Sequence, residues 1–119
     1  MTFERACALG DVPTDEALAV TVDRYDLAIA RDGDEVFALQ DLCSHAAVSL
    51  SEGEVSSTDL GCTIECWLHG STFDLRTGKP TSLPATEPVA TFPTEIRSDD
   101  GTDWVYVDVE TTLNGVTPA

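Results

Sequence analysis

Residues 43–45 read Cys-Ser-His and residues 66–69 read Cys-Trp-Leu-His, and these two short stretches decide how the whole chain is interpreted. The chain has only two histidines, His45 and His69, and each follows a cysteine by two or three positions. Thiolate and imidazole are soft and borderline ligands, which suit zinc or an iron–sulfur centre rather than magnesium or calcium. The spacing therefore predicts a metal site that takes one cysteine and one histidine from each stretch.

Two kinds of metal site compete for this pattern. Zinc sites with two cysteines and two histidines commonly place the two cysteines in one motif and the two histidines in another. Here each stretch carries one cysteine, Cys43 or Cys66, and one histidine. That interleaving fits a two-iron cluster in which one iron takes both thiolates and the other takes both imidazoles. The order of the ligands favours the iron–sulfur cluster, and a structural zinc-binding module is the alternative.

The sequence on both sides of these stretches is typical of β-strands. Residues 17–22, 25–30 and 35–40 are short, rich in apolar residues and separated by polar turn residues. Residues 104–109 form another run rich in β-branched and aromatic residues, and residues 3–9 are predicted to pair with it. The pattern predicts an all-β base made of antiparallel strands, folded as a sandwich or barrel.

Residues 41–93 have a different composition, dense in Gly, Ser, Thr and Pro with only short apolar segments. A loop-rich stretch of this length in a compact domain needs something to hold it together. We therefore expect residues 41–93 to be a loop-rich insert that binds the metal. Residues 1–110 are predicted to form a single domain, and residues 111–119 a flexible C-terminal tail.

Composition excludes several classes of protein. A chain of 119 residues and 12.7 kDa amounts to one domain. Its formal net charge of −16 excludes non-specific nucleic-acid binding, which requires neutralisation of phosphates. No stretch approaches the ~20 consecutive apolar residues of a membrane span, and the first residues lack the basic start of a signal peptide. We expect no nucleic acid and no membrane as partners, a cytoplasmic location, and cysteines that serve a metal rather than disulfides.

Around the four candidate ligands, the sequence resembles the Rieske [2Fe–2S] ferredoxins, which are electron carriers of multicomponent ring-hydroxylating oxygenases. Residues 64–80, Ile-Glu-Cys-Trp-Leu-His-Gly-Ser-Thr-Phe-Asp-Leu-Arg-Thr-Gly-Lys-Pro, follow the second ligand loop of that family and the turn after it nearly position for position. Residues 50–53, Leu-Ser-Glu-Gly, are similar to the segment after the first loop, and Pro84-Ala85 to the proline-rich loop that covers the cluster. The resemblance extends over about residues 2–109.

The resemblance implies one Rieske [2Fe–2S] cluster per chain. By that resemblance, Cys43 and Cys66 bind the inner iron, and His45 and His69 bind the outer iron near the surface. It implies no catalytic residue, because these ferredoxins carry electrons and are not enzymes by themselves.

The resemblance also gives roles to neighbours of the ligands. Ser71 is expected to donate a hydrogen bond to the cluster, as its counterparts in high-potential relatives do. Phe73 stands where those relatives carry a tyrosine, so one donor is missing and we predict a potential at the low end of the class, about −150 mV. Trp67, Leu68 and Pro84 are expected to surround the exposed histidines.

Two further cysteines, Cys7 and Cys62, lie outside both ligand stretches, and each is expected to be a small buried hydrophobe. Respiratory Rieske proteins carry an extra cysteine pair that forms a disulfide; the matching positions here are Val48 and Leu68. The predicted function is therefore a monomeric carrier that takes electrons from a flavin-dependent ferredoxin reductase and passes them to a terminal non-heme iron dioxygenase. A ferredoxin of iron–sulfur cluster assembly is the alternative within the same family.

Overall fold

The computed structural model of the chain describes residues 3–33, 35–43, 48–58, 61–68, 70–83 and 85–116. In chain order, its elements are β1 (Glu4–Ala8), the short 3-10 helix η1 (Leu9–Asp11), β2 (Leu18–Val22), β3 (Tyr25–Asp32), β4 (Glu35–Gln40), the 3-10 helix η2 (Leu50–Glu52), β5 (Val55–Thr58), β6 (Gly61–Glu65), β7 (Thr72–Asp74), β8 (Thr91–Phe92), β9 (Thr94–Asp99) and β10 (Thr102–Val107). All the strand pairings are antiparallel, which confirms the predicted all-β class. Within the described ranges, no helix has the length and hydropathy to cross a membrane.

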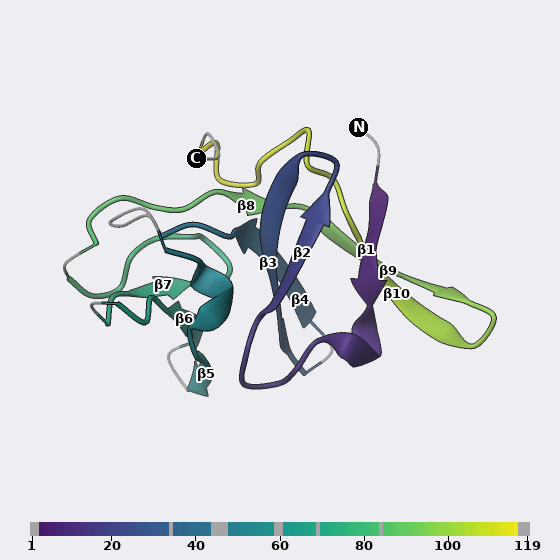
Figure 1. Cartoon of the computed structure of the whole chain (residues 1–119), viewed down its shortest axis with the longest axis horizontal. Helices are drawn as coiled ribbons and strands as arrows, with labels where there is room; N and C mark the ends of the chain where they lie inside the picture. Colours follow the sequence, from purple (N-terminus) through teal and green to yellow (C-terminus); the bar gives the residue numbers. More distant parts are fainter. Residues whose placement is uncertain are drawn as a thin grey trace.

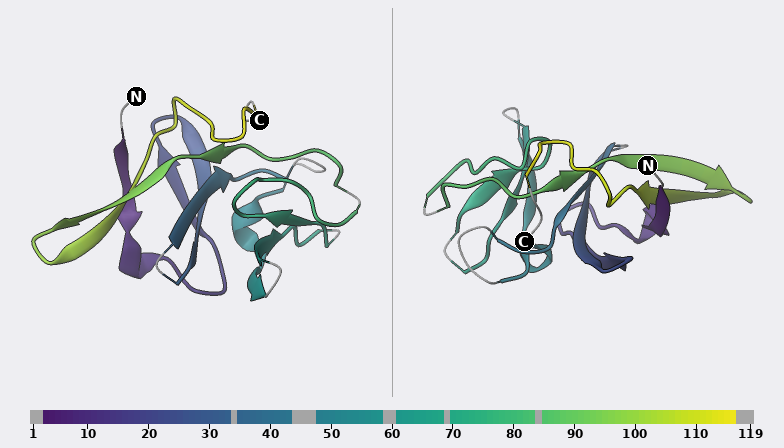
Figure 2. Two further views of the ribbon diagram at one scale, coloured as in Figure 1. Left: turned by 180° about the vertical axis from the view of Figure 1, so that it is seen from behind. Right: turned by 90° about the horizontal axis from the view of Figure 1, so that it is seen from above.

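The strands form three sheets, with the orders β1-β10-β9, β2-β3-β4-β8 and β5-β6-β7. Figure 1 shows the sheet of β2, β3, β4 and β8 between the other two, and the view from above in Figure 2 shows the same order. The chain leaves this central sheet after β4, builds the sheet of β5 to β7, and returns as β8 beside the strand it left, with Leu39 opposite Thr91. The loop-rich part of the chain is thus attached to the base at both of its ends.

Strand β3 is buried on both faces. Leu27 and Ile29 belong to a core that the central sheet shares with β10, whereas Ala28 and Ala30 belong to a second core shared with β6 and β7. All four side chains are fully buried. Successive side chains of a strand point to opposite faces, so a strand between two layers needs apolar residues at every position. This explains the continuous apolar run in the sequence.

The last hairpin differs from the prediction. Strand β10 covers Thr102–Val107, about two residues earlier than the predicted run 104–109, because Asp100 and Gly101 adopt positive φ values of 51° and 81° and the chain turns there. Strand β9 (Thr94–Asp99) was not predicted at all. Its side chains are mostly exposed and polar, so it lacks an alternating apolar pattern. The predicted pairing of the N-terminal residues with this strand is confirmed by β1, which pairs with β10.

The end of the chain returns to the body of the protein. The Leu113 amide donates a hydrogen bond to the Thr91 carbonyl at 2.8 Å. The Asn114 side-chain amide donates to the carbonyls of Thr77 at 2.9 Å and Val89 at 2.8 Å. The tail expected to be flexible from residue 111 onward is therefore anchored at Leu113 and Asn114, and its residues 117–119 lie outside the described part of the chain.

Candidate metal centre

Two buried thiols mark the candidate site. Cys66 directly follows β6, and Cys43 lies just beyond the end of β4. Their exposed fractions are 1 % and 3 %, and both belong to the core that lies between the central sheet and the insert. None of the chain's four cysteines forms a disulfide. Three other predicted site residues, His45, His69 and Pro84, lie outside the described residues.

The second ligand stretch is held by a compact backbone turn. The Cys66 amide donates to the Ser71 carbonyl at 2.6 Å, and the Gly70 amide donates back to the Cys66 carbonyl at 2.9 Å. Gly70 has a φ of +75°, which an L side chain adopts only with strain. The glycine lets the loop reverse between Cys66 and β7, so that the thiol faces the core.

In the first ligand stretch, Cys43 is hydrogen-bonded to the residue at which the described chain resumes, Val48. The Cys43 amide donates to the Val48 carbonyl at 3.0 Å, so these two residues lie side by side. Leu50, in η2, is fully buried in the same core as both thiols. Val48 packs partly against that core.

Ser71 is placed to connect the second ligand loop with the segment that follows Pro84. Its side chain is fully buried, and its Oγ accepts a hydrogen bond from the Ala85 amide at 3.1 Å. A hydroxyl oxygen that accepts one bond still has its own hydrogen to donate. The geometry therefore leaves Ser71 able to be the donor that the sequence predicts.

Phe73 lies in β7, opposite Ile64 in β6, and its backbone also bridges to Pro80. Its side chain is fully buried in the insert core. The phenyl ring packs in the same core as both thiols and brings no polar group there. The role of Phe73 as a neighbour of the cluster stays a prediction.

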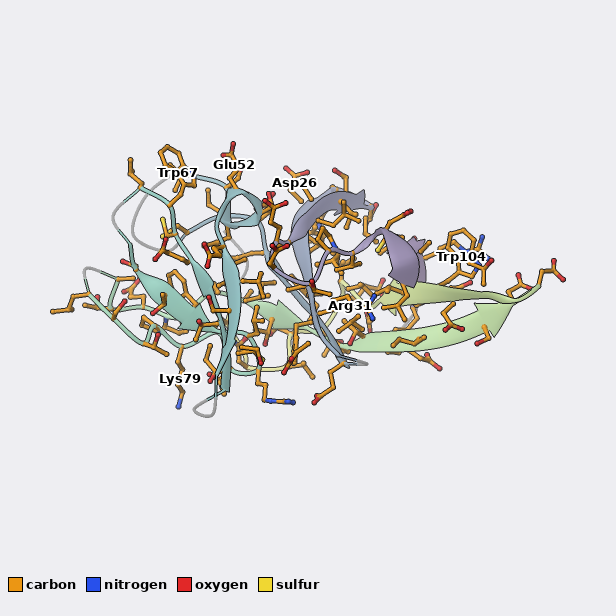
Figure 3. The ribbon with its side chains drawn as sticks, turned by 90° about the horizontal axis from the view of Figure 1, so that it is seen from below. Asp26, Arg31, Glu52, Trp67, Lys79 and Trp104 are labelled. Atoms are coloured by element: carbon orange, nitrogen blue, oxygen red, sulfur yellow. The ribbon has the colours of Figure 1, made fainter. Side chains whose placement is uncertain are left out.

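Large apolar side chains are exposed on the loops of the insert. Trp67 is 50 % exposed, Leu68 41 % and Leu83 76 %. Figure 3 shows Trp67 and Glu52 at the insert end of the molecule and Trp104 at the opposite end. Sequence analysis singled out Trp67 and Leu68 as neighbours of the two histidines and did not single out Leu83, since a single leucine in a proline-rich loop gives no periodic signal. Exposed apolar groups of this kind are typical of surfaces that bind other proteins.

Carboxylates border the same end of the protein. Asp15, Glu16, Glu52 and Glu54 line a shallow hollow around Gly53. All four side chains are exposed. They add negative potential beside the exposed apolar residues and would attract a partner with a basic face.

The other two cysteines have the properties of structural thiols. Burial raises the pKa of the Cys7 thiol to about 11, and nearby Asp11 adds to the effect. Burial likewise raises the pKa of the Cys62 thiol, with a further contribution from Asp32. Because metals bind thiolates, a raised pKa disfavours ligation. Cys62 is buried, as expected, whereas Cys7 is only partly buried, against the core that the central sheet shares with β10.

The donors present fit a [2Fe–2S] cluster. Cys43 and Cys66 reach one core from separate loops, and each is shielded from water. Buried sulfur donors near a hydroxyl such as that of Ser71 suit iron–sulfur chemistry, in which hydrogen bonds to sulfur adjust the potential. The arrangement can therefore hold a cluster close to a surface that is accessible to other proteins.

Comparisons with known proteins agree with this chemistry. Residues 2–93 match the Rieske [2Fe-2S] domain. The biphenyl dioxygenase ferredoxin subunit of Pseudomonas sp. (strain KKS102) is 43 % identical over 100 residues, which cover 84 % of this chain and 89 % of that protein.

Solved structures show the same similarity. A ferredoxin of Sphingomonas yanoikuyae B1 superposes with a TM-score of 0.76 at 32 % identity, over 90 % of this chain and 98 % of that one. A chain from the complex of reduced oxygenase and oxidized ferredoxin in carbazole 1,9a-dioxygenase superposes with a TM-score of 0.72 at 35 % identity, over 86 % of this chain and 99 % of that one.

Proposed function

This chain belongs to the Rieske [2Fe–2S] domain family, and on that premise we propose that Cys43 and Cys66 hold one iron of its cluster, and His45 and His69 the other. The burial of both thiols in one core, on two separate loops, is the observation that supports this assignment. When bound, the cluster takes up and releases one electron, at a potential that the two imidazoles raise above that of an all-thiolate cluster.

The protein is a one-electron carrier of the ferredoxin-subunit type and not an enzyme by itself, as its relatives are subunits that serve dioxygenases. The fold around the site performs two tasks for this role. Residues Leu50, Phe73 and Ala85 keep water from the sulfur side of the site, since all three are almost fully buried. Ser71 presents a hydroxyl to the same region.

The partner that receives the electron is a terminal ring-hydroxylating dioxygenase. This assignment is supported by the biphenyl dioxygenase relative and by the carbazole dioxygenase ferredoxin seen in complex with its oxygenase. A flavin-dependent ferredoxin reductase supplies the electron, and the carrier works as a monomer in the cytoplasm. The alternative role in cluster assembly has no support among these relatives.

The docking face is the exposed apolar surface of Trp67, Leu68 and Leu83. The acidic side chain of Glu52 lies at the same end of the molecule as Trp67. Small interfaces suit a carrier that must leave one partner for the next. The net charge of −16 steers partners that present basic residues at their docking face.

One experiment tests the ligand assignment. The protein is purified without air, its iron and inorganic sulfide are measured, and an electron paramagnetic resonance spectrum is recorded after reduction. The expected result is two irons per chain and an average g value below that of an all-thiolate cluster. Cys43→Ser and Cys66→Ser should lose the cluster. A colourless protein, or an unchanged signal after replacement of both His45 and His69, would contradict the proposal.

A second experiment tests the docking face with two tryptophans of the same chain. Trp67→Ala should lower the rate of electron transfer to a biphenyl-type dioxygenase, whereas Trp104→Ala, at the opposite end, should leave that rate unchanged. The wild-type rate should also fall as salt rises, because screening weakens the attraction of a basic partner. Equal effects of the two substitutions would place docking elsewhere.

A further inference from the structure

Asp41 makes polar contacts across the first ligand loop. One carboxylate oxygen, Oδ1, accepts a hydrogen bond from the Ser51 amide at 2.7 Å. The other, Oδ2, accepts one from the Ser51 hydroxyl at 2.8 Å. The Asp41 amide itself donates to the Asp26 carbonyl in β3 at 3.0 Å, so the residue is fixed to the central sheet.

These contacts join the described residues on the two sides of the first ligand stretch. Asp41 and Ser51 are ten positions apart, and Cys43 and His45 lie between them. Closing a loop costs chain entropy, and hydrogen bonds to an ionised carboxylate are stronger than those between neutral groups. The Asp41–Ser51 contact therefore holds the loop entrance against η2, whose Leu50 is buried in the core with the thiols.

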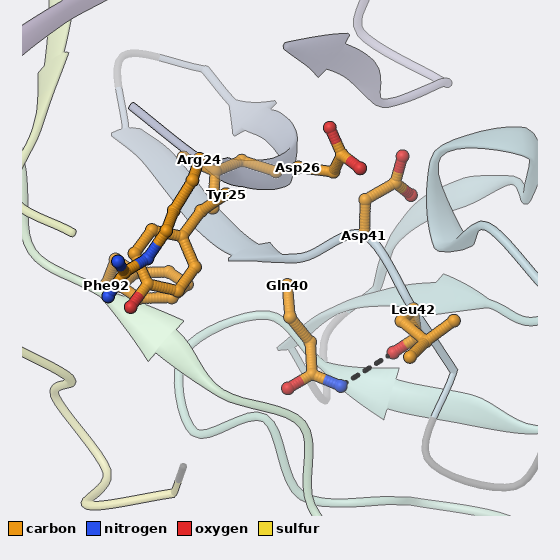
Figure 4. Close-up of a pocket in the computed structure, with 8 residues that line it drawn as sticks. Arg24, Tyr25, Asp26, Gln40, Asp41, Leu42 and Phe92 are labelled. Atoms are coloured by element: carbon orange, nitrogen blue, oxygen red, sulfur yellow. Dashed lines mark hydrogen bonds between the residues drawn. The ribbon is translucent and has the colours of Figure 1, made fainter. Parts of the chain in front are cut away.

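The residue before Asp41 fixes the same entrance from the other side. Gln40 is 5 % exposed, and its side-chain nitrogen donates to the Leu42 carbonyl at 2.8 Å. Its side-chain oxygen accepts from the Ala90 amide at 3.0 Å. Figure 4 shows the Gln40 amide directed at Leu42, and the carboxylates of Asp26 and Asp41 on the other side of the pocket. Gln40 and Asp41 together fix the position of Leu42, which directly precedes Cys43.

We propose that Asp41 is a positioning residue for the cluster: its carboxylate ties the chain just before Cys43 to η2, and so controls how slowly the cluster is released and how the Cys43 thiol is oriented. The inference rests on the proposed assignment of Cys43 and His45 as ligands. No sequence pattern singles out Asp41, because one aspartate in a loop looks like any solvated acid.

Asp26 provides a matched control for charge. It lines the same pocket as Asp41, and its carboxylate accepts a hydrogen bond only from the Thr21 hydroxyl, at 2.9 Å, among the contacts the described residues show. Asp26→Ala and Asp41→Ala remove the same charge from the same pocket. Only Asp41→Ala removes the contact to Ser51, so a difference between the two variants measures the contact and not the charge.

The test uses the protein with its cluster bound. Iron release into an excess of a chelator is followed by the loss of visible absorption, and the g values of the reduced cluster are recorded. Asp41→Ala should release iron about tenfold faster than wild type, which corresponds to about 1.4 kcal/mol, and should shift the g values. Asp41→Asn should recover most of the wild-type behaviour, because the amide can exchange hydrogen bonds with the Ser51 hydroxyl. Asp26→Ala should match wild type in both measurements.

Ser51→Ala keeps the experiment decisive if Asp41→Ala does not fold. It removes only the hydroxyl contact, and iron release should be about threefold faster than wild type. Wild-type release and g values in both Asp41→Ala and Ser51→Ala, or equal effects of Asp26→Ala and Asp41→Ala, would overturn the proposal. A wrong ligand assignment gives a different result, in which Cys43→Ser retains the cluster.

Discussion

The backbone carbonyl of Glu65 occupies the space that a β-carbon on Gly53 would need. Gly53 follows η2 at the exit of the first ligand loop, and Glu65 directly precedes Cys66 in the second. The Glu65 amide also donates to the Glu54 carbonyl at 2.9 Å. The two ligand loops are thus packed backbone against backbone, and the absence of a side chain at position 53 sets how closely they approach.

Gly53→Ala should destabilise the protein by about 1–3 kcal/mol, because the new methyl group would displace the backbone next to Cys66. The φ of Gly53 is −88°, so alanine is strained there by contact and not by its backbone angles. The measurement is the urea midpoint of unfolding together with iron content. Gly10→Ala is the control, since nothing lies within 4 Å of its β-carbon. Equal stability of the two variants would show that the loops can separate without cost.

Ser71→Ala should destabilise the protein by about 1–3 kcal/mol, because the buried amide of Ala85 loses its acceptor. It should also lower the reduction potential, as the cluster loses a hydrogen-bond donor. Both quantities are measured, by unfolding and by voltammetry. Ser82→Ala is the comparison: its hydroxyl accepts from the Thr72 amide at 3.0 Å, but the residue is exposed, and changes within about 0.5 kcal/mol are expected. An unchanged potential in Ser71→Ala would remove Ser71 from the neighbourhood of the cluster.

Phe73→Tyr should raise the reduction potential above that of the wild type, which we expect at about −150 mV, because it adds a hydroxyl donor to a fully buried position of the insert core. Voltammetry at fixed pH gives both values. Phe92→Tyr is a suitable control, because Phe92 is equally buried but belongs to the base core. A wild-type potential above +150 mV would mean that donors other than a tyrosine set the potential of this protein.

The ion pair between Glu35 and Arg76 joins the start of β4 to the turn after β7, with two contacts of 2.6 Å. The Arg76 guanidinium lowers the pKa of Glu35 below its ordinary value of 4.5. A carboxyl group whose pKa is lowered by folding contributes to the free energy of unfolding. That contribution is fully present above pH 4.5 and is lost as the pH falls through the lowered pKa of the folded protein. Glu35→Gln should therefore be less stable than wild type at pH 7, and the difference should shrink as the pH falls below 4.5.

The measurement for this pair is the urea midpoint of wild type and Glu35→Gln at a series of pH values and at low salt. Glu95→Gln tests the general effect of losing one surface charge, because Glu95 contacts Arg97 within the same strand and joins no separate parts of the fold. A difference between wild type and Glu35→Gln that does not change with pH would contradict the role of the ionised carboxylate.

Features with a periodic or chemical signal were predicted from sequence, and those built from single polar contacts were not. Strand β3 was found because both of its faces are buried. The interleaving of cysteine and histidine singled out Cys43 and Cys66, and the structure buries both in one core. Strand β9 was missed because its side chains are exposed. The contact between Asp41 and Ser51 could not be predicted, because it depends on the position of η2 in the folded protein. The spacing of residues in the sequence does not give that position.

Substitution of both remaining cysteines, Cys7→Ala and Cys62→Ala, should leave the cluster intact. Burial keeps both thiols protonated near neutral pH, and Cys7 lies in β1, apart from the insert. The double variant should keep two irons per chain and the wild-type spectrum, and should lose about 1 kcal/mol of stability from the small cavity at Cys62.

In the single variant Cys62→Ala, iodoacetamide should modify Cys7 slowly at pH 8 and faster as the pH rises through about 11, since only the thiolate reacts. Loss of iron in the double variant would mean that one of these thiols is a ligand, and the assignment of Cys43 and Cys66 would have to change.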